Sequence, residues 1–220
     1  MGKTVNVTGA TGLVGKALVK QLLDEDAVEK VNVFVRRSTG IRHPKLREQV
    51  IDFEHPESWK PLVAGDVLFS TLGTTLKKAK SKANQYRVDF TYQYEFARAA
   101  AENGVPVYVL VSSAGADSRS AIFYSRMKGE LDEAVRLLPF AHCTILRPSI
   151  LVGAREERRP AEVWAAAITT VVTRYLFRKY RPVAAETVAR AMIAAAFHPG
   201  SESQTVVELD EIFTLAGNRR

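Results

Sequence analysis

The sequence contains little cysteine and no long apolar run. Cys143 is the single cysteine among 220 residues, so no disulfide can form within the chain, and a reducing compartment is expected. No apolar run reaches the roughly 20 residues that a membrane-spanning helix requires. The first residues lead directly into an apolar strand, without the regions of a secretory signal. These absences predict a cytoplasmic protein without a membrane span.

Clustered metal ligands and internal repeats are also missing from the sequence. Four histidines share no spacing typical of a metal site: His43, His55, His142 and His198. We therefore predict no bound metal. No repeat, low-complexity tract or flexible linker divides the chain, and its length suits one large α/β domain better than two.

Basic residues outnumber acidic ones. The chain has 31 lysines and arginines against 24 aspartates and glutamates, which gives a net charge of +7. This excess favours anionic partners such as phosphorylated cofactors, nucleic acid or acidic lipid, but it serves solubility equally well. Aromatic residues are not interleaved with the basic ones and no nucleic-acid motif is present, so we expect no nucleic-acid partner.

Short β-rich runs alternate with segments of helical periodicity as far as Pro148. Strands are predicted at 4–8, 31–35, 49–53, 66–70, 107–112 and 142–146, and helices at 12–23, 81–102 and 121–138. This alternation predicts an α/β fold, a Rossmann-type doubly wound parallel sheet in a single domain over residues 1–220. Ligands of such sheets bind at the carboxyl ends of the strands.

The pattern loosens after Pro148. Helices are predicted at 162–179 and 186–197, and a last strand at 204–209. We interpret residues 149–220 as a small helical cap on the substrate side of the same domain.

A glycine-rich turn follows the first predicted strand and opens the first predicted helix. Its spacing, GxxGxxG, is typical of dinucleotide binding in this context. Gly9 permits a tight turn, Gly12 lets the backbone approach a pyrophosphate, and Gly15 lets helix and strand pack closely. The N–H groups of the first helical turn attract the phosphates. The predicted cofactor-binding residues of this turn are Gly9, Ala10, Thr11, Gly12, Leu13, Val14 and Gly15.

The end of the second predicted strand indicates which nucleotide binds. NAD-binding proteins of this fold carry an acidic residue there for the ribose 2′-hydroxyl, whereas this chain has Arg36, Arg37 and Ser38. Guanidinium groups bind phosphate through a planar set of donors. We therefore predict NADP(H) rather than NAD(H), with a merely exposed basic turn as the alternative.

Two further strand ends are expected to line the cofactor. Asp52 and Phe53 follow the third predicted strand and are expected to flank the adenine. Four residues after the next strand are expected to line the nicotinamide ribose: Thr71, Leu72, Gly73 and Thr74.

Three residues form a candidate catalytic group. Tyr124 and Lys128 are four residues apart in a predicted helix, which places them on one face. A nearby ammonium stabilises a phenolate, so such a tyrosine can act as general acid or base nearer neutral pH. Ser112 ends the preceding strand and can hydrogen-bond a substrate carbonyl. Together with a dinucleotide turn, these residues predict hydride transfer between nicotinamide and a carbonyl.

These residues lie within motifs that resemble the atypical branch of the short-chain dehydrogenase/reductase superfamily. The motifs are LGTT at 72–75, RVD at 87–89, VSSAGAD at 111–117, FYSRMKGE at 123–130 and LRPS at 146–149. They are most similar to the Tat-interacting-protein group and its bacterial homologues, over nearly the whole chain. Pro148, in the last motif, is a further predicted cofactor-binding residue.

The resemblance implies a Rossmann fold that binds NADP(H). It also implies Tyr124 as acid or base, Lys128 on the nicotinamide ribose and Ser112 beside the carbonyl. Classical members use an asparagine on the fourth helix in a proton relay. Here the nearby residues are Asn84 and Asp89, and the choice between them stays open.

Other features have plainer alternatives. A basic loop either attracts an anionic substrate or is simply solvated: Lys77, Lys78, Lys80 and Lys82. Three arginines either clamp a substrate anion or begin a charged helix: Arg155, Arg158 and Arg159. The apolar stretch at 164–180 is a lid, a dimer surface, a membrane-surface helix or, by default, core.

The sequence thus predicts an NADP(H)-dependent oxidoreductase acting on a small carbonyl or alcohol. An NADP(H)-sensing regulatory protein would bind the same cofactor without needing Tyr124 and Lys128. A nucleotide-sugar epimerase shares the glycine turn, but the segment after Pro148 is short for holding a sugar nucleotide. A homodimer and a monomer both remain open.

Overall fold

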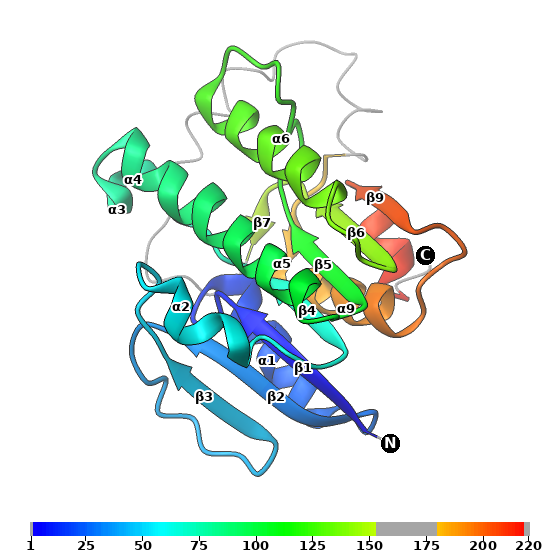
Figure 1. Ribbon diagram of the computed structural model, residues 1–220. Helices are drawn as coiled ribbons and strands as arrows, with labels where there is room; N and C mark the ends of the chain where they lie inside the picture. Colours follow the sequence, from blue (N-terminus) through cyan, green and yellow to red (C-terminus); the bar gives the residue numbers. More distant parts are fainter. Residues whose placement is uncertain (1, 153–179, 218–220) are drawn as a thin grey trace.

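The computed structural model describes residues 2–152 and 180–217 (Figure 1). A seven-stranded sheet runs in the order β3-β2-β1-β4-β5-β6-β9, and every neighbouring pair is parallel. Its strands are β1 (Lys3–Thr8), β2 (Val28–Val35), β3 (Leu46–Val50), β4 (Val67–Ser70), β5 (Val107–Val111), β6 (His142–Arg147) and β9 (Gln204–Glu208). The predicted doubly wound sheet is confirmed, and its strand order reverses between β1 and β4.

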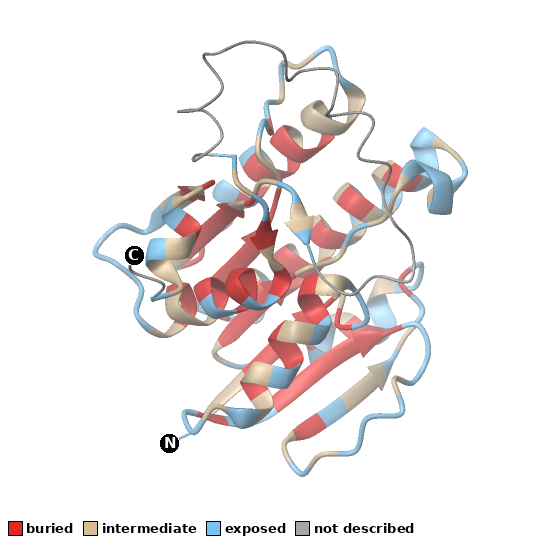
Figure 2. Ribbon diagram, turned by 180° about the vertical axis from the view of Figure 1, so that it is seen from behind, coloured by how far each residue is buried: buried red, intermediate tan, exposed pale blue. Residues whose placement is uncertain are grey.

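Helices cover both faces of this sheet. α1 (Leu13–Asp24) and α9 (Ala185–Phe197) lie on one face. α5 (Tyr92–Glu102) and α6 (Phe123–Arg136) lie on the other face. The two layers can be followed in Figure 1 and, from behind, in Figure 2, where buried residues line the sheet and the inner faces of the helices.

Each face of the sheet buries its own apolar cluster. In β2, Val31, Val33 and Val35 join the cluster with α1 and α9, whereas Phe34 joins the cluster with α5 and α6. Side chains alternate between the faces of a strand. Burial on both faces explains why the last three residues of β2, Val33–Val35, are all apolar.

Several short elements connect the main ones. They are α2 (Pro56–Trp59), the 3-10 turn η1 (Lys60–Leu62), α3 (Leu76–Ala79), α4 (Lys82–Tyr86), the π-helical turn η2 (Arg87–Thr91), α10 (Glu211–Leu215) and the parallel pair β7 (Leu151–Val152) and β8 (Val183–Ala184). Elements of one turn are too short to show a hydrophobic period. The helix predicted at 81–102 is present, but it is divided into three successive elements, α4, η2 and α5.

The third strand differs from its predicted position. The sequence predicts it at 49–53, whereas β3 spans Leu46–Val50. β3 is an edge strand paired only with β2 among the described strands, and its sequence LREQV is mostly polar. The apolar residues that suggest a strand, Ile51 and Phe53, instead pack from the following loop into the cluster with α5 and α6.

The segment interpreted as a cap also contributes to the body of the protein. β9 extends the main sheet beside β6, and α9 packs in the same cluster as α1. The helix predicted at 162–179 lies outside the described residues. A substrate-side role for residues 149–220 stays a prediction. Across the two described ranges, no helix combines the length and apolar character needed to cross a bilayer.

Candidate active site

The predicted site residues lie at the carboxyl edge of the sheet. All paired strands are parallel, so the segments that follow β1 through β6 emerge at this edge. The reversal of strand order between β1 and β4 opens a crevice there in folds of this kind. The glycine turn follows β1 at that point.

The three glycines of this turn allow contacts that larger residues would prevent. Gly9 has a φ of +78°, and a Cβ added to it would lie 2.5 Å from the carbonyl carbon of Thr71. A Cβ on Gly15 would lie 2.1 Å from the carbonyl oxygen of Gly9. The N–H of Gly12 donates to that same oxygen at 2.8 Å. The turn therefore brings β1, α1 and the loop after β4 into direct contact.

The start of α1 leaves backbone donors for an anion. Gly12 is the N-cap residue, and no side chain caps the helix. Lys16 N–H donates to Gly12 O at 2.9 Å, so the N–H groups of residues 13–15 precede the first helical bond. Thr11 is exposed and Leu13 is half-buried. Two side chains of the turn serve packing instead: Ala10 and Val14.

Arg36 and Arg37 directly follow β2, and both are exposed. The next residues of the loop are fixed to β3, because Glu48 accepts hydrogen bonds from Ser38 Oγ at 2.6 Å and from Thr39 N at 2.9 Å. The Ser38 hydroxyl and then the Thr39 hydroxyl lower the pKa of the Glu48 carboxyl. Ser38, expected beside a 2′-phosphate, therefore donates to Glu48 in this structure, which leaves the phosphate-binding prediction to the two arginines.

Asp52 and Phe53 differ in what they can offer an adenine. Asp52 is exposed, and its Oδ1 accepts from Glu54 N at 3.0 Å. The Phe53 ring is buried, with its centroid 5.2 Å from the ring of Tyr92 and 5.5 Å from that of Phe96. The Phe53 side chain is part of the core, so only its backbone is available to a nucleotide.

The loop after β4 is held at both ends. Thr71 donates through N and Oγ1 to the carbonyl of the last residue of β1, at 3.0 and 2.8 Å. Thr74 N–H donates to Asp89 Oδ2 at 2.8 Å. Between them, Leu72 packs against the cluster with α5 and α6, and Gly73 is exposed. The loop is therefore fixed against the glycine turn on one side and η2 on the other.

Ser112, Tyr124 and Lys128 come from two neighbouring elements. Ser112 directly follows β5 and is 6% exposed, and its Oγ has no hydrogen-bond partner among the described residues. Tyr124 and Lys128 lie one helical turn apart on α6; the tyrosine is half-buried and the lysine is 3% exposed. A buried hydroxyl without a partner is uncommon and suits a position that a ligand oxygen completes.

Close packing fixes the start of α6 against the loop after β5. A Cβ on Gly129 would lie 2.1 Å from the backbone nitrogen of Ser118. Asp117 N–H donates to the carbonyl of Ser125 at 3.0 Å. The turn of α6 that carries Tyr124 is therefore anchored to this loop.

Pro148 lies next to the same loop. It directly follows β6 and is buried, and its carbonyl accepts from Ala114 N–H at 3.0 Å. The ends of β5 and β6 therefore lie side by side, and Pro148 bounds this part of the site.

Asp89, not Asn84, lies next to the candidate catalytic group. Asn84 is exposed, and its side chain donates to Ala79 O at 2.9 Å. Asp89 is 2% exposed, and its Oδ1 lies 4.0 Å from Lys128 Nζ.

Asp132 is a second buried carboxylate, and it was not predicted from the sequence. Asp132 is 2% exposed and its Oδ2 accepts from Arg147 Nε at 2.9 Å, while Arg147 also donates to Glu208 at 2.8 Å. Burial raises the pKa of the Asp132 carboxyl, and the nearby Ser112 hydroxyl and Arg147 act in the opposite direction. Its place four residues after Lys128, on the same helical face, was the available signal.

The remaining features have structural roles or lie elsewhere. Lys82 Nζ lies 5.5 Å from the centroid of the Phe123 ring, which links α4 to α6. Lys77, Lys78 and Lys80 are exposed around α3. Cys143 is buried, and burial raises the pKa of its thiol to about 12, as expected for a packing residue. Three arginines lie outside the described residues: Arg155, Arg158 and Arg159.

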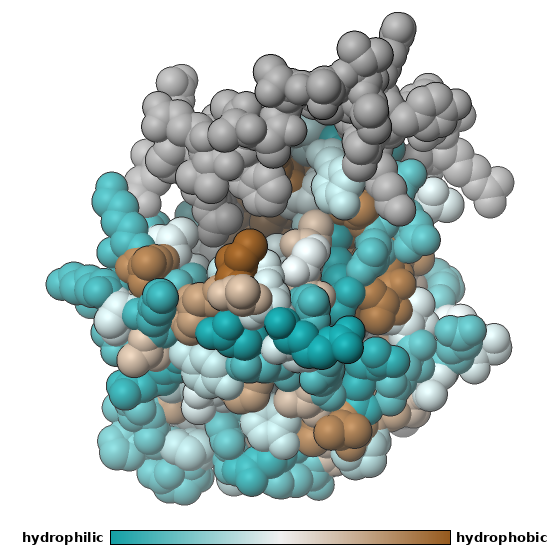
Figure 3. Space-filling view, turned by 90° about the horizontal axis from the view of Figure 1, so that it is seen from above, coloured by the Kyte–Doolittle hydropathy of each residue, from teal (hydrophilic) through white to brown (hydrophobic). Residues whose placement is uncertain are grey.

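The described part of the face seen from above is mainly hydrophilic (Figure 3). Viewed from above, hydrophobic residues form small separate patches between hydrophilic ones (Figure 3). Exposed apolar residues in the segments around α3 and the start of α6 are Leu76 and Ile122.

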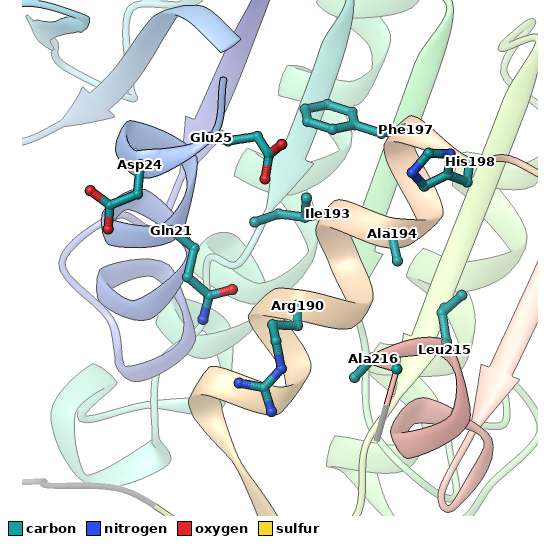
Figure 4. Close-up of a pocket in the computed structure, with 11 residues that line it drawn as sticks. Gln21, Asp24, Glu25, Arg190, Ile193, Ala194, Phe197, His198, Leu215 and Ala216 are labelled. Carbon is teal, nitrogen blue, oxygen red and sulfur yellow. The ribbon is translucent and has the colours of Figure 1, made fainter. Parts of the chain in front are cut away.

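One pocket lies away from this site. It has a volume of about 620 Å³ and lies between α1, α9 and α10, where Gln21, Arg190 and Ile193 line it (Figure 4). Asp24 and His198, which also line it, stand at the carboxyl ends of α1 and α9, just before β2 and β9 begin. The pocket is therefore at the amino edge of the sheet, opposite the predicted cofactor site.

Comparisons with known proteins agree with the fold. A family model described as NAD(P)H-binding matches residues 9–199. Protein fmp52, mitochondrial, of Aspergillus fumigatus is 33% identical over an alignment 232 positions long, which covers 98% of this chain and 99% of the relative. The protein of the same name from Emericella nidulans is 38% identical over 168 residues, 73% of this chain and 72% of the relative.

Solved structures show the same fold. A short-chain dehydrogenase/reductase superfamily protein from Agrobacterium tumefaciens with bound NAD superposes with a TM-score of 0.70 at 16% identity, over 94% of this chain and 77% of that one. The UDP-glucose 4-epimerase of Thermotoga maritima gives a TM-score of 0.68 at 15% identity, over 98% of this chain and 82% of that one.

The relatives correct one prediction. Both are named mitochondrial, so the cytoplasmic location predicted from the sequence is wrong. A lone cysteine excludes an internal disulfide, but it does not distinguish one reducing compartment from another. On the matched residues and the relatives, the chain belongs to the NAD(P)H-binding family, and it shares its fold with solved structures of the short-chain dehydrogenase/reductase superfamily.

Proposed function

We propose that this protein is an NADP(H)-dependent oxidoreductase that interconverts a small carbonyl compound and its alcohol. The observation that carries the proposal is the buried Ser112 hydroxyl, which lies near the Asp132 carboxyl but makes no hydrogen bond of acceptable geometry among the described residues. Ser112 directly follows the strand that precedes the helix of Tyr124 and Lys128. This arrangement supports a carbonyl oxygen bound between Ser112 and Tyr124.

The chain has suitable residues for the cofactor. The close contacts at Gly9 and Gly15 and the uncapped start of α1 fit a pyrophosphate. Arg36 and Arg37 would hold the 2′-phosphate, and Lys128 the hydroxyls of the nicotinamide ribose. When bound, NADPH supplies the hydride for reduction.

The side chains of this chain supply the proton and the orientation. In reduction, the Tyr124 hydroxyl donates a proton to the carbonyl oxygen, and the Lys128 ammonium stabilises the resulting phenolate. The Ser112 hydroxyl donates a hydrogen bond to the same oxygen and fixes the substrate. In alcohol oxidation the proton moves in the opposite direction.

The experiment that tests this function compares the wild-type protein with Tyr124→Phe. NADPH affinity is measured by calorimetry, and turnover is measured as loss of NADPH absorbance with a panel of aldehydes and ketones. Removing the acid should reduce kcat by at least about 100-fold and leave NADPH affinity within about twofold, because the lost hydroxyl acts on the substrate.

Three results would contradict the proposal. Equal turnover by Tyr124→Phe would exclude Tyr124 as the acid. NADPH binding without turnover of any carbonyl would favour a cofactor-sensing protein, and conversion of a sugar nucleotide without net consumption of NADPH would favour an epimerase.

A further inference from the structure

Two polar side chains follow the apolar residues that β5 and β6 turn toward α5 and α6. Leu110 of β5 and Ile145 of β6 belong to the apolar cluster on this face. Side chains two residues apart in a strand point to the same face, so Ser112 and Arg147 also point toward α6. The two strand ends are neighbours, because Ser112 N–H donates to Leu146 O at 2.8 Å. The apolar face therefore ends in a pair of polar side chains beside the predicted active site.

Asp132 of α6 lies over these two strand ends. Its side chain is 2% exposed, and its Oδ2 accepts from Arg147 Nε at 2.9 Å. Arg147 in turn donates through Nη1 to Glu208 Oε1, at the end of β9, at 2.8 Å. The Arg147 guanidinium is thus bound to a carboxylate on each side, and it fixes one oxygen of Asp132 in a defined place.

The other oxygen of Asp132 and the Ser112 hydroxyl complement each other. Asp132 Oδ1 and Ser112 Oγ are both buried and make no hydrogen bond among the described residues, although the two side chains lie near each other. A hydroxyl has one hydrogen to donate, whereas a carboxylate can only accept. Leaving either buried atom unpaired is costly. The hydrogen of Ser112 is therefore the complementary partner for Asp132 when no substrate is bound.

The charged groups around Asp132 favour its ionised form. Burial is the largest influence and raises the pKa of this carboxyl, whereas the Ser112 hydroxyl, Arg147 and Lys128 all lower it. Hydrogen bonds to an ionised acceptor are stronger than those to a neutral one. As a carboxylate, Asp132 therefore competes with the neutral oxygen of a carbonyl substrate for the one hydrogen of Ser112.

We propose that Asp132 is a positioning residue for Ser112: the carboxylate, fixed by Arg147, holds the serine hydroxyl and gives up its hydrogen to the oxygen of a bound substrate. This inference rests on the proposed oxidoreductase function. Asp132 touches neither the cofactor nor the substrate, and it acts on the reaction through Ser112. The hydrogen bond from Ser112 to the substrate is therefore weaker than it would be without the competing acceptor.

The test is Asp132→Asn, which reverses the direction of the hydrogen bond. Arg147 Nε can only donate, so it should keep the amide oxygen of the asparagine and turn the amide NH₂ group toward Ser112. Ser112 then accepts from the amide, and its own hydrogen points to the substrate. We expect kcat/KM for carbonyl reduction to rise at least about threefold and NADPH affinity to stay within about twofold. A fall or no change in kcat/KM would overturn the proposal.

Ser112→Ala provides the matched background for this test. It has no hydroxyl to direct, so adding Asp132→Asn should change kcat/KM by less than about twofold. An effect transmitted through Lys128 or through packing would persist in this background. Equal changes with and without the serine hydroxyl would therefore contradict the proposal.

A second measurement requires neither turnover nor the asparagine variant. The pKa of the Asp132 carboxyl is followed by NMR of ¹³C-labelled aspartate in the wild-type protein and in Ser112→Ala. Loss of the hydroxyl should raise this pKa, because the ionised carboxylate loses a donor. An unchanged pKa would overturn the proposal. If the wild-type protein reduces no carbonyl while this pKa does rise, the proposed function fails, whereas the contact between Asp132 and Ser112 stands.

Discussion

At the scale of single residues, we expect Arg36 and Arg37 to distinguish the two nicotinamide cofactors. Both are exposed at the end of β2, where the loop beyond them is fixed to Glu48. Arg36→Ala together with Arg37→Ala should weaken NADPH by at least about tenfold, because charge-assisted bonds to the 2′-phosphate are lost. NADH lacks that phosphate and should bind as before. Parallel calorimetric titrations give the ratio, and an equal loss for both cofactors would refute the assignment.

A comparison of Gly9 with Gly104 distinguishes the effect of backbone conformation on stability from the effect of close packing. Their φ angles are +78° and +76°, but an added Cβ meets the Thr71 backbone at 2.5 Å at Gly9 and nothing within 4 Å at Gly104. Gly104→Ala should lower the free energy of unfolding by about 1–2 kcal/mol, the cost of the left-handed conformation. Gly9→Ala should lower it by at least about 4 kcal/mol and weaken NADPH binding. Urea unfolding measures both, and equal losses would rule out the close approach.

Some residue roles were readable from the sequence and others were not. The glycine turn and the pair Tyr124 and Lys128 depend on short-range spacing, so the sequence places them on the right elements. The burial of Phe53 depends on Tyr92 and Phe96, which are distant in the sequence. Its core role was therefore not visible from the strand-end rule.

At the scale of elements, the helix over residues 82–102 shows what periodicity misses. An apolar and polar pattern predicts that the segment is helical, but it does not show that one turn, Arg87–Thr91, is π-helical. Asp89, which lies in this turn, faces Lys128, whereas Asn84 is exposed. The choice between two nearby residues therefore needed the backbone geometry.

α9 gives a direct test of whether the segment after Pro148 is core or cap. Ala191 is fully buried among the residues packed with α1, whereas Ala194 is half-buried and lines the pocket of Figure 4. Ala191→Leu should lower the free energy of unfolding by about 1–3 kcal/mol through overpacking. Ala194→Leu has room and should change it by less than about 0.5 kcal/mol. If thermal and urea unfolding show both variants equally tolerated, α9 is not part of the cooperative core.

For the whole molecule, Asp132 should impose a pH dependence on stability. Burial raises the folded-state pKa of its carboxyl above an unfolded value of about 4. The folded state therefore binds this proton more tightly, so its contribution is complete below about pH 4 and is lost as the pH rises through the folded pKa. Asp132→Asn removes this dependence while keeping the shape.

The measurement is the difference in unfolding free energy between the wild-type protein and Asp132→Asn, from urea titrations at several pH values. The free energy of unfolding of the wild-type protein should fall relative to that of Asp132→Asn as the pH rises from about 4. The difference should then level off. Taking the difference cancels the contribution of carboxyls with lowered pKa, such as Glu48, because both proteins contain them. A difference independent of pH would mean that Asp132 is not buried as the structure has it.

β9, the last of the sheet strands in the described sequence, forms the edge of the sheet beside β6. This order affects folding during synthesis. β9 pairs with β6 along its whole length: Gln204 lies opposite Cys143, and Glu208 lies opposite Arg147. While the ribosome is still synthesising the chain, β6 must wait with an unpaired edge until residues near the carboxyl end have emerged. Such an edge can pair with other chains. The nascent protein therefore exposes this edge in the interval between the synthesis of β6 and that of β9.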